Sequence, residues 1–125
     1  MLDPLETIAV VAAEGPGLVG EAGALTLVSQ LYGHDISWVA VPLSRLGQGF
    51  LRLETREAGL MLQKLTNYGL CLAVVGDITE AMATSRSLRD FVREAERGQR
   101  VCFLPDAAAL AARFRPVDLP EVLDE

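Results

Sequence analysis

The side chains of this chain that could do chemistry are few and far apart. His34 is the only histidine, and Cys71 and Cys102 are the only cysteines. No serine or cysteine lies beside His34 for it to activate, so a hydrolytic triad would need long-range assembly, and we interpret His34 as a surface turn residue. One histidine and two separated cysteines cannot supply the usual nitrogen and sulfur ligands of a zinc site. We therefore assign no catalytic residue, no metal ion and no cofactor.

The strongest polar candidate is Asp77, in the segment Gly76-Asp77-Ile78-Thr79. This segment directly follows an apolar run that is typical of a buried strand, and open α/β sheets bind ligands at the carboxyl ends of their strands. Gly76, Asp77 and Thr79 are therefore candidate ligand residues. The alternative is a turn or capping aspartate that bonds its own backbone.

A second candidate is the glycine-rich turn Gly15-Pro16-Gly17-Leu18-Val19-Gly20, which has the spacing GxGxxG between a predicted strand and a predicted helix. Backbone amides in such a turn can hold a phosphate. Pro16 removes one of those amides, and Asp35 follows too early for the acidic residue of a dinucleotide-binding fold. The turn predicts either a nucleotide or small-ligand site, or a plain flexible connection.

Arginines recur at steps of three and four residues in the segment after Ser85. At 100° per residue they gather on one side of a helix, opposite Leu88, Phe91 and Val92. One interpretation is a solvated face crossed by weak ion pairs with neighbouring acids. The other is a docking surface for a protein partner with an acidic surface or for a phosphorylated ligand. The candidate docking residues are Arg86, Arg89, Arg93 and Arg97, with Arg100 beyond them.

Apolar runs and helical periodicities alternate along the chain. The runs typical of buried strands are residues 7–13, 35–42, 70–75 and 100–104. The segments with helical spacing are residues 21–32, 55–68, 85–97 and 107–113. This alternation predicts a single α/β domain with a four- to five-stranded, mainly parallel sheet and flanking helices. No element is assigned to residues 43–53, where two glycines interrupt any period.

The ends of the helices carry recognisable signals. Thr55, Ser85 and Asp106 are expected N-caps, and glycines at 33, 69 and 98 are expected to end the preceding helices. Residues 1–115 are expected to form the domain. Residues 116–125 are acidic and interrupted by prolines, and we expect a mobile tail.

Charge and hydropathy restrict the class of protein. The formal net charge is −6 and the sequence pI is about 4.7, which argues against binding to nucleic-acid phosphates or anionic membranes. No apolar stretch approaches the roughly 20 residues of a membrane span, and the start lacks a signal-peptide pattern, so we expect a cytoplasmic protein. The cysteines are then reduced, small apolar side chains; a redox pair would require neighbouring strands of suitable geometry.

The motif AGLMLQKLTNYGLCLAVVGD, followed by SLRDFVREAERG, resembles an uncharacterised family of small bacterial α/β domains, a domain-of-unknown-function family, over about residues 5–114. The order of elements is also similar to that of STAS domains, the fold of anti-sigma factor antagonists. The STAS resemblance implies a phosphorylatable hydroxyl at the start of a helix, which falls on Thr55. The segment Glu54-Thr55-Arg56-Glu57 lacks the serine pair and glycine of that motif, so the alternative is a Thr55 that only caps the helix.

Three classes of function remain open from the sequence. We favour a non-enzymatic regulatory or protein-interaction module. The alternative is a small-ligand or nucleotide binder, in which the Gly15–Gly20 turn and the Gly76–Thr79 loop meet at one pocket; an enzyme is the third. Homodimerisation through Trp38, Phe50 or residues 43–53 would require these apolar side chains to be exposed.

Overall fold

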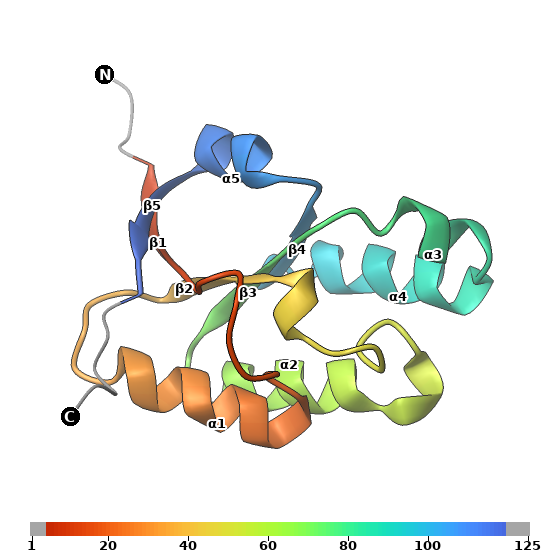
Figure 1. Ribbon diagram of the computed structural model, residues 1–125, viewed down its shortest axis with the longest axis horizontal. Helices are drawn as coiled ribbons and strands as arrows, with labels where there is room; N and C mark the ends of the chain where they lie inside the picture. Colours follow the sequence, from red (N-terminus) through yellow and green to blue (C-terminus); the bar gives the residue numbers. More distant parts are fainter. Residues whose placement is uncertain (1–4, 120–125) are drawn as a thin grey trace.

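The computed structural model describes residues 5–119, which form one α/β unit built on a five-stranded parallel sheet (Figure 1). The order across the sheet is β4-β3-β2-β1-β5, and every neighbouring pair is parallel. This confirms the predicted α/β class and parallel sheet. The strands are β1 (Glu6–Val10), β2 (Trp38–Pro42), β3 (Cys71–Val75), β4 (Val101–Leu104) and β5 (Phe114–Asp118).

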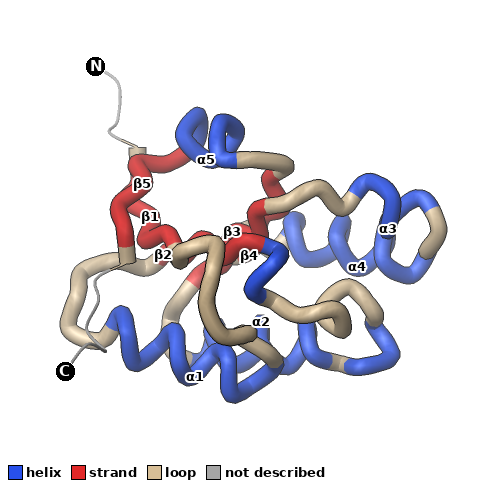
Figure 2. Tube along the Cα trace, in the orientation of Figure 1, coloured by secondary structure: helices blue, strands red, loops and turns tan. Residues whose placement is uncertain are grey.

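The helices are distributed unequally over the two faces of the sheet. Because β1, β2, β3 and β4 follow one another in a single direction, right-handed crossovers place their connecting helices on the same face. The chain then crosses back from β4 to β5, and this connection lies on the opposite face (Figures 1 and 2). The helices are α1 (Gly20–Leu31), α2 (Glu57–Asn67), α3 (Thr79–Ala83), α4 (Arg86–Arg97) and α5 (Ala107–Arg113).

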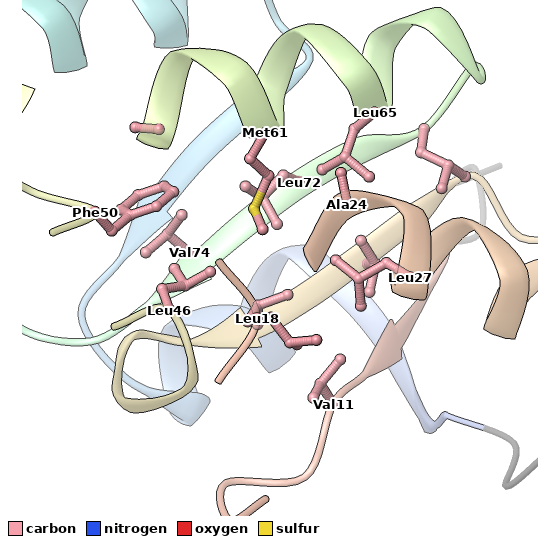
Figure 3. Packing of buried hydrophobic residues seen from close by; sticks show 14 of the residues in the cluster. Val11, Leu18, Ala24, Leu27, Leu46, Phe50, Met61, Leu65, Leu72 and Val74 are labelled. Carbon is pink, nitrogen blue, oxygen red and sulfur yellow. The ribbon is translucent and has the colours of Figure 1, made fainter. Parts of the chain in front are cut away.

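The larger core lies between the sheet and the helices α1 and α2. Leu27 of α1, Met61 of α2 and Leu72 of β3 are fully buried members of one cluster, in which Met61 lies beside Leu72 (Figure 3). Gly23 allows α1 to pack closely against the segment that precedes it, because a Cβ there would lie 2.5 Å from the backbone carbonyl carbon of Leu18. This face is sealed by long aliphatic side chains, as the helical spacing predicted.

Residues 43–53 contribute to this core although their sequence has no clear period. The segment contains the 3₁₀ turn η1 (Leu43–Arg45), and a second turn, η2 (Leu53–Thr55), follows it. Leu46 is fully buried and Phe50 is only 1% exposed, so both belong to the interior beneath α2 (Figure 3). Phe50 is therefore unavailable for an interface, which removes it from the predicted homodimer surface. Homodimerisation through Trp38 or the rest of residues 43–53 stays a prediction.

The opposite face has a much smaller core. Small side chains occupy its centre, where Ala40 pairs with Ala73 and Ala73 pairs with Cys102 across three strands. Leu110 of α5 and Phe114 of β5 cover part of this row. Leu110 is the one buried residue of α5. The short helix therefore covers only part of this face.

Two helix caps occur as predicted and one does not. The Ser85 hydroxyl accepts from the Leu88 N–H at 3.1 Å, and the Asp106 carboxylate accepts from the Ala109 N–H at 2.9 Å. The N-cap of α2 is Arg56, in a left-handed conformation with φ of 65°, rather than Thr55. The turn η2 occupies Thr55, so the helix begins two residues later than the periodicity indicated.

Two elements were not expected from the sequence. The short helix α3 follows the Asp77 segment, and β5 begins within the domain and includes residues assigned to the tail. Pro116 is tolerated in β5 because this is an edge strand. The Leu119 N–H bonds the Val10 carbonyl, so by alternation the nitrogen of Pro116 faces away from β1. Residues 120–125 of the predicted tail lie outside the described residues.

Candidate functional site

A cavity of about 1000 Å³ lies at the carboxyl ends of β1, β2 and β3, beside α5. Its walls are mostly aliphatic. Its polar side chains are Glu14 and Arg45 from the connections after β1 and β2, Gln30 from α1 and Asp118 from the end of β5. We call it the Arg45 cavity. The residues that carry its chemistry are Val10, Ala40, Pro42, Val75, Leu110, Glu14, Arg45 and Asp118.

Arg45 is held at the rim by the turn that follows β1. Its Nε donates to the Pro16 carbonyl at 2.8 Å, and its Nη1 donates to the carbonyls of Ala12 at 2.7 Å and Glu14 at 3.3 Å. The Arg45 carbonyl accepts from the Leu18 N–H at 2.6 Å. Half-burial and three side-chain hydrogen bonds therefore hold this guanidinium at the carboxyl edge of the sheet, and the bond to the Arg45 carbonyl holds its backbone.

The glycine-rich turn thus wraps a cation from within the chain. A Cβ on Gly15, whose φ is 149°, would lie 2.8 Å from the Arg45 Cζ, so glycine lets the turn close over the guanidinium. Carbonyl oxygens are the groups that the turn directs inward at this point. The sequence had instead predicted that backbone amides of this turn could hold a phosphate. Glu14 and Pro16, at the start of the turn, line the cavity.

The charged groups of the cavity are not paired with one another. Ion pairs between described residues join Lys64 with Glu21 on α1 and α2, and otherwise lie along α4. Within residues 5–119, none involves Arg45, Glu14 or Asp118. The cavity therefore contains one guanidinium and two carboxylates without an ionic partner among the described residues, over an aliphatic floor.

The Asp77 segment lies next to this site without forming its wall. Val75 lines the cavity, whereas Gly76, Asp77 and Thr79 do not. A Cβ on Gly76, whose φ is 156°, would meet the Leu43 Cβ at 2.7 Å, so this glycine permits close packing of η1. The predicted convergence of two loops is therefore wrong for this cavity: the Gly15–Gly20 turn lines it through Pro16, and no residue of the Gly76–Thr79 loop does.

Asp77 itself is exposed and lies two residues before the first residue of α3. Its Oδ1 accepts from the Thr79 N–H at 2.9 Å. Hydrogen bonding by Thr79, first from its side chain and then from its backbone, lowers the pKa of Asp77 from its usual value. This is the local bond of a turn aspartate, and a ligand role for Asp77 remains a prediction.

The arginines of α4 have unequal environments. Arg89 is half-buried and its Nη1 donates to the Met82 carbonyl at 2.6 Å, which fastens the end of α3 to α4. Arg93 pairs with Asp90 at 3.3 Å and Arg97 with Glu94 at 3.9 Å, and all four of these side chains are more than half exposed. Arg86 is exposed. The solvent-facing part of the predicted stripe is thus Arg86, Arg93 and Arg97.

Thr55 anchors the connection between η2 and α2. Its hydroxyl oxygen lies 2.7 Å from the Gly49 carbonyl and 2.8 Å from the Arg52 carbonyl, and it accepts from the Glu57 N–H at 3.2 Å. The side chain is exposed. A phosphate on this oxygen would remove the donated hydrogen bond, so modification would loosen the turn; whether it occurs stays a prediction.

The two cysteines lie on the α5 face, on neighbouring strands, and are free. Cys102 pairs with Ala73, so Cys71 is displaced by two residues, about 6.6 Å along the strand on top of the ~4.8 Å between strands. That diagonal is too long for a disulfide. Burial raises the pKa of both thiols, which keeps them protonated and weakly nucleophilic.

A second, smaller cavity of about 490 Å³ lies on the α5 face near the amino ends of β2 and β4. Its lining includes Trp38, Cys102, Arg113 and Glu96. The Trp38 and Phe114 rings are 4.9 Å apart between centroids and tilted by 50°. Trp38 is therefore half-buried against Phe114. The large exposed apolar side chains lie elsewhere, with Tyr32 85% and Tyr68 57% exposed at the ends of α1 and α2.

Three further features considered from the sequence are the single histidine, a metal site and a membrane-spanning helix. His34 is exposed in the turn after α1. Residues 5–119 contain no group of three or more histidine, cysteine or acidic side chains placed to hold a metal ion. None of the helices in that range combines the length and apolarity needed to cross a membrane.

Arg45 and Asp118 were not singled out from the sequence. Arg45 lies three residues after β2, and its position at the carboxyl end of a parallel strand was the available signal. The two glycines after it obscured that signal. Asp118 was hidden because β5 itself was not expected.

Comparisons with known proteins add a family and no activity. No curated protein and no solved structure shows a significant match to the chain. The model of a domain of unknown function, DUF4180, matches residues 5–114, which is nearly the whole of the described fold. The chain therefore belongs to the DUF4180 family, the domain of unknown function that its two sequence motifs had indicated.

Proposed function

We propose that this domain is a non-enzymatic small-ligand-binding module that holds its ligand in the Arg45 cavity. The observation that carries the proposal is the location of this cavity, at the carboxyl edge of a parallel sheet, where α/β proteins usually bind their ligands. Its volume of about 1000 Å³ is at the upper end of the ordinary range for small-molecule sites. Its mixture of an aliphatic floor and a few polar groups is also typical of such sites.

The cover over the cavity supports the same proposal. The helix α5 is seven residues long and is attached mainly through Leu110. Ala107 and Leu110 line the cavity, so a small displacement of α5 would change access to it. A ligand beneath α5 would add contacts that bind this helix more firmly to the sheet, and binding would then be sensed at the surface by other proteins.

A thermal-shift panel of amino acids, carboxylic acids, nucleotides and sugars tests the proposal. A ligand that binds only the folded state raises its melting temperature. Val75→Phe should abolish the shift, because Val75 is half-buried in the cavity wall and a larger ring there occupies the space. Val117→Phe is the matched control, since Val117 is half-buried on β5 and does not line the cavity. A blank panel, or shifts that survive Val75→Phe, would contradict the proposal.

The second candidate is a protein-interaction module, as favoured from the sequence, with α4 as the docking surface. Its support is the exposure of Arg86, Arg93 and Arg97, whose ion pairs are open to solvent and exchange readily for those of a partner. The partner would present an acidic surface. The two proposals are compatible, because no residue of α4 lines the Arg45 cavity.

The interaction surface is tested by reversing its charge. Arg86→Glu, Arg93→Glu and Arg97→Glu together should reduce capture of partner proteins from the native host by at least about tenfold. Arg89 is left unchanged because it fastens α3. Arg52→Glu and Arg56→Glu form a control on another exposed surface. Equal capture by both variants would remove α4 as the docking surface.

We also propose a cytoplasmic location and a regulatory role for this domain. Two free cysteines and an acidic composition support a reducing, cytoplasmic environment. A STAS-like regulatory role would involve Thr55 at the junction of η2 and α2. Mass spectrometry of protein isolated from its native host tests that role; an unmodified Thr55 in all growth conditions would contradict it.

A further inference from the structure

The Arg45 cavity contains unpaired charge of both signs, and this restricts the chemistry of its ligand. Arg45 donates to three carbonyl oxygens through Nε and Nη1, and its Nη2 makes no hydrogen bond to any residue in the range 5–119. Carbonyl dipoles orient the guanidinium without neutralising its charge. An anionic group of a ligand could therefore bind at Nη2 with a charge-assisted hydrogen bond.

The carboxylates of the same cavity oppose a simple anion. Glu14 and Asp118 both line it, and neither pairs with a cation in the described part of the chain. The Glu14 carbonyl accepts from Arg45, so the residue that supplies one carboxylate lies directly beside the guanidinium. Asp118 lies beside Val10 across the β1–β5 pair. A ligand carrying only negative charge would be repelled by these groups, and one carrying both signs would satisfy them.

The rest of the cavity requires an apolar body. Val10, Ala40, Pro42 and Val75 form its floor on the sheet, and Leu110 closes it from α5. Val10 pairs with Ala40, and Pro42 with Val75, so these four residues form one apolar patch across β1, β2 and β3. No aromatic side chain lines this cavity among the described residues, so nothing there would stack on a nucleobase.

We propose, on the basis of the small-ligand function above, that the Arg45 cavity binds a free amino acid with a branched apolar side chain. The ligand carboxylate lies at Arg45, its ammonium group lies toward Glu14 or Asp118, and its side chain lies on the aliphatic floor. Such a zwitterion has both charged groups on one carbon atom. Arg45 and Glu14 both line the cavity and are in contact through the Glu14 carbonyl, so neighbouring residues offer a guanidinium and a carboxylate to the two charged groups of the ligand.

Calorimetric titration with four related compounds tests the ligand class. L-leucine carries both charges, 4-methylpentanoate lacks the ammonium group, 3-methylbutylamine lacks the carboxylate, and 3-methylbutanol lacks both. L-leucine should bind at least about tenfold more tightly than any of the other three, because each charged hydrogen bond contributes about 1.5–3 kcal/mol. Equal affinity for L-leucine and 4-methylpentanoate would overturn the zwitterion.

Matched variants assign the contacts. Arg45→Gln and the double variant Glu14→Gln, Asp118→Asn should each weaken L-leucine binding about tenfold or more. Arg52→Gln and Glu54→Gln are the controls, since both residues are exposed outside the cavity. If Arg45→Gln does not fold because three carbonyls lose their donor, the double variant decides. Unchanged binding in the double variant would overturn the inference.

Failure of the ligand class and failure of the binding site give different results. If L-leucine does not bind, but another compound raises the melting temperature and Val75→Phe removes its effect, the cavity is a ligand site of another class. If no compound in the panel binds, or if binding survives Val75→Phe, the proposed function itself is wrong.

Discussion

The two faces of the sheet differ in how completely they are covered. Over the face beneath α1 and α2, sixteen described residues form a continuous buried cluster, whereas seven form the cluster beneath α5. The first face is closed by long helices and by the buried Leu46 and Phe50. The second is covered by one short helix and has cavities on both sides of it. Stability therefore resides mainly on one face, and the other has space for recognition.

The largest expected loss of stability is on the face beneath α1 and α2, which we call the filled face. Phe50→Ala should lower the free energy of unfolding by about 3–5 kcal/mol, because it removes a ring that is 1% exposed and leaves a cavity. Urea denaturation measures this loss. Leu60→Ala, at an exposed position of α2, should cost less than about 1 kcal/mol. A similar loss for both variants would contradict the burial of the connection.

On the α5 face, the corresponding truncation should cost less. Leu110→Ala should lower the free energy of unfolding by about 2 kcal/mol, at the lower end of the range for buried leucine, because its surroundings already include a cavity. The same urea experiment compares it with Leu27→Ala on α1, whose side chain is fully buried. A larger loss for Leu110→Ala would reverse the comparison.

The capping residues Ser85 and Asp106 give a further comparison between the two faces of the sheet. Ser85→Ala and Asp106→Ala should each cost about 1 kcal/mol, because each leaves a helix N–H without its acceptor. Only Asp106→Ala should accelerate alkylation of Cys102, which is 4% exposed and packs in the α5 cluster. Iodoacetamide labelling followed by mass spectrometry measures both rates. Equal acceleration by Ser85→Ala would show that α5 does not shield this thiol.

The smallest effect concerns Asp77. Its pKa in the folded state lies below the usual value, so its hydrogen bonds stabilise the fold at neutral pH, and this contribution is lost as the pH falls through the folded pKa. Asp77→Asn should therefore reduce the acid-dependent part of the unfolding free energy, measured between pH 2 and 5. Asp35→Asn, in an exposed turn, serves as the control. An identical pH profile for wild type and Asp77→Asn would contradict this assignment.

The filled face was the more predictable of the two. Continuous apolar runs marked β1, β2, β3 and β4, and the helix α1 on that face begins and ends within one residue of the expected bounds. The strand β5 was missed because Arg115 and Pro116 break any strand pattern, and only its edge position explains them. Phe50 was considered as a possible interface residue because its burial depends on tertiary packing that local periodicity does not contain.

The candidate site was less predictable because its residues come together only through topology. The glycine spacing indicated the correct turn, but its chemistry depends on Arg45, which is 29 residues from Pro16 in sequence. Asp118 enters the cavity only because the chain crosses back to β1. Sequence patterns report which residues belong to an element, whereas parallel pairing determines which of them share an edge.

The most direct test of the account is a titration of ¹⁵N-labelled protein with L-leucine, followed by amide chemical shifts. The account predicts that the largest changes occur at Ala12, Ala13, Val75 and Ala107, around the Arg45 cavity, and that α4 remains unaffected. Changes centred on α4 or on the outer surface of α1 and α2, with none around the cavity, would contradict it.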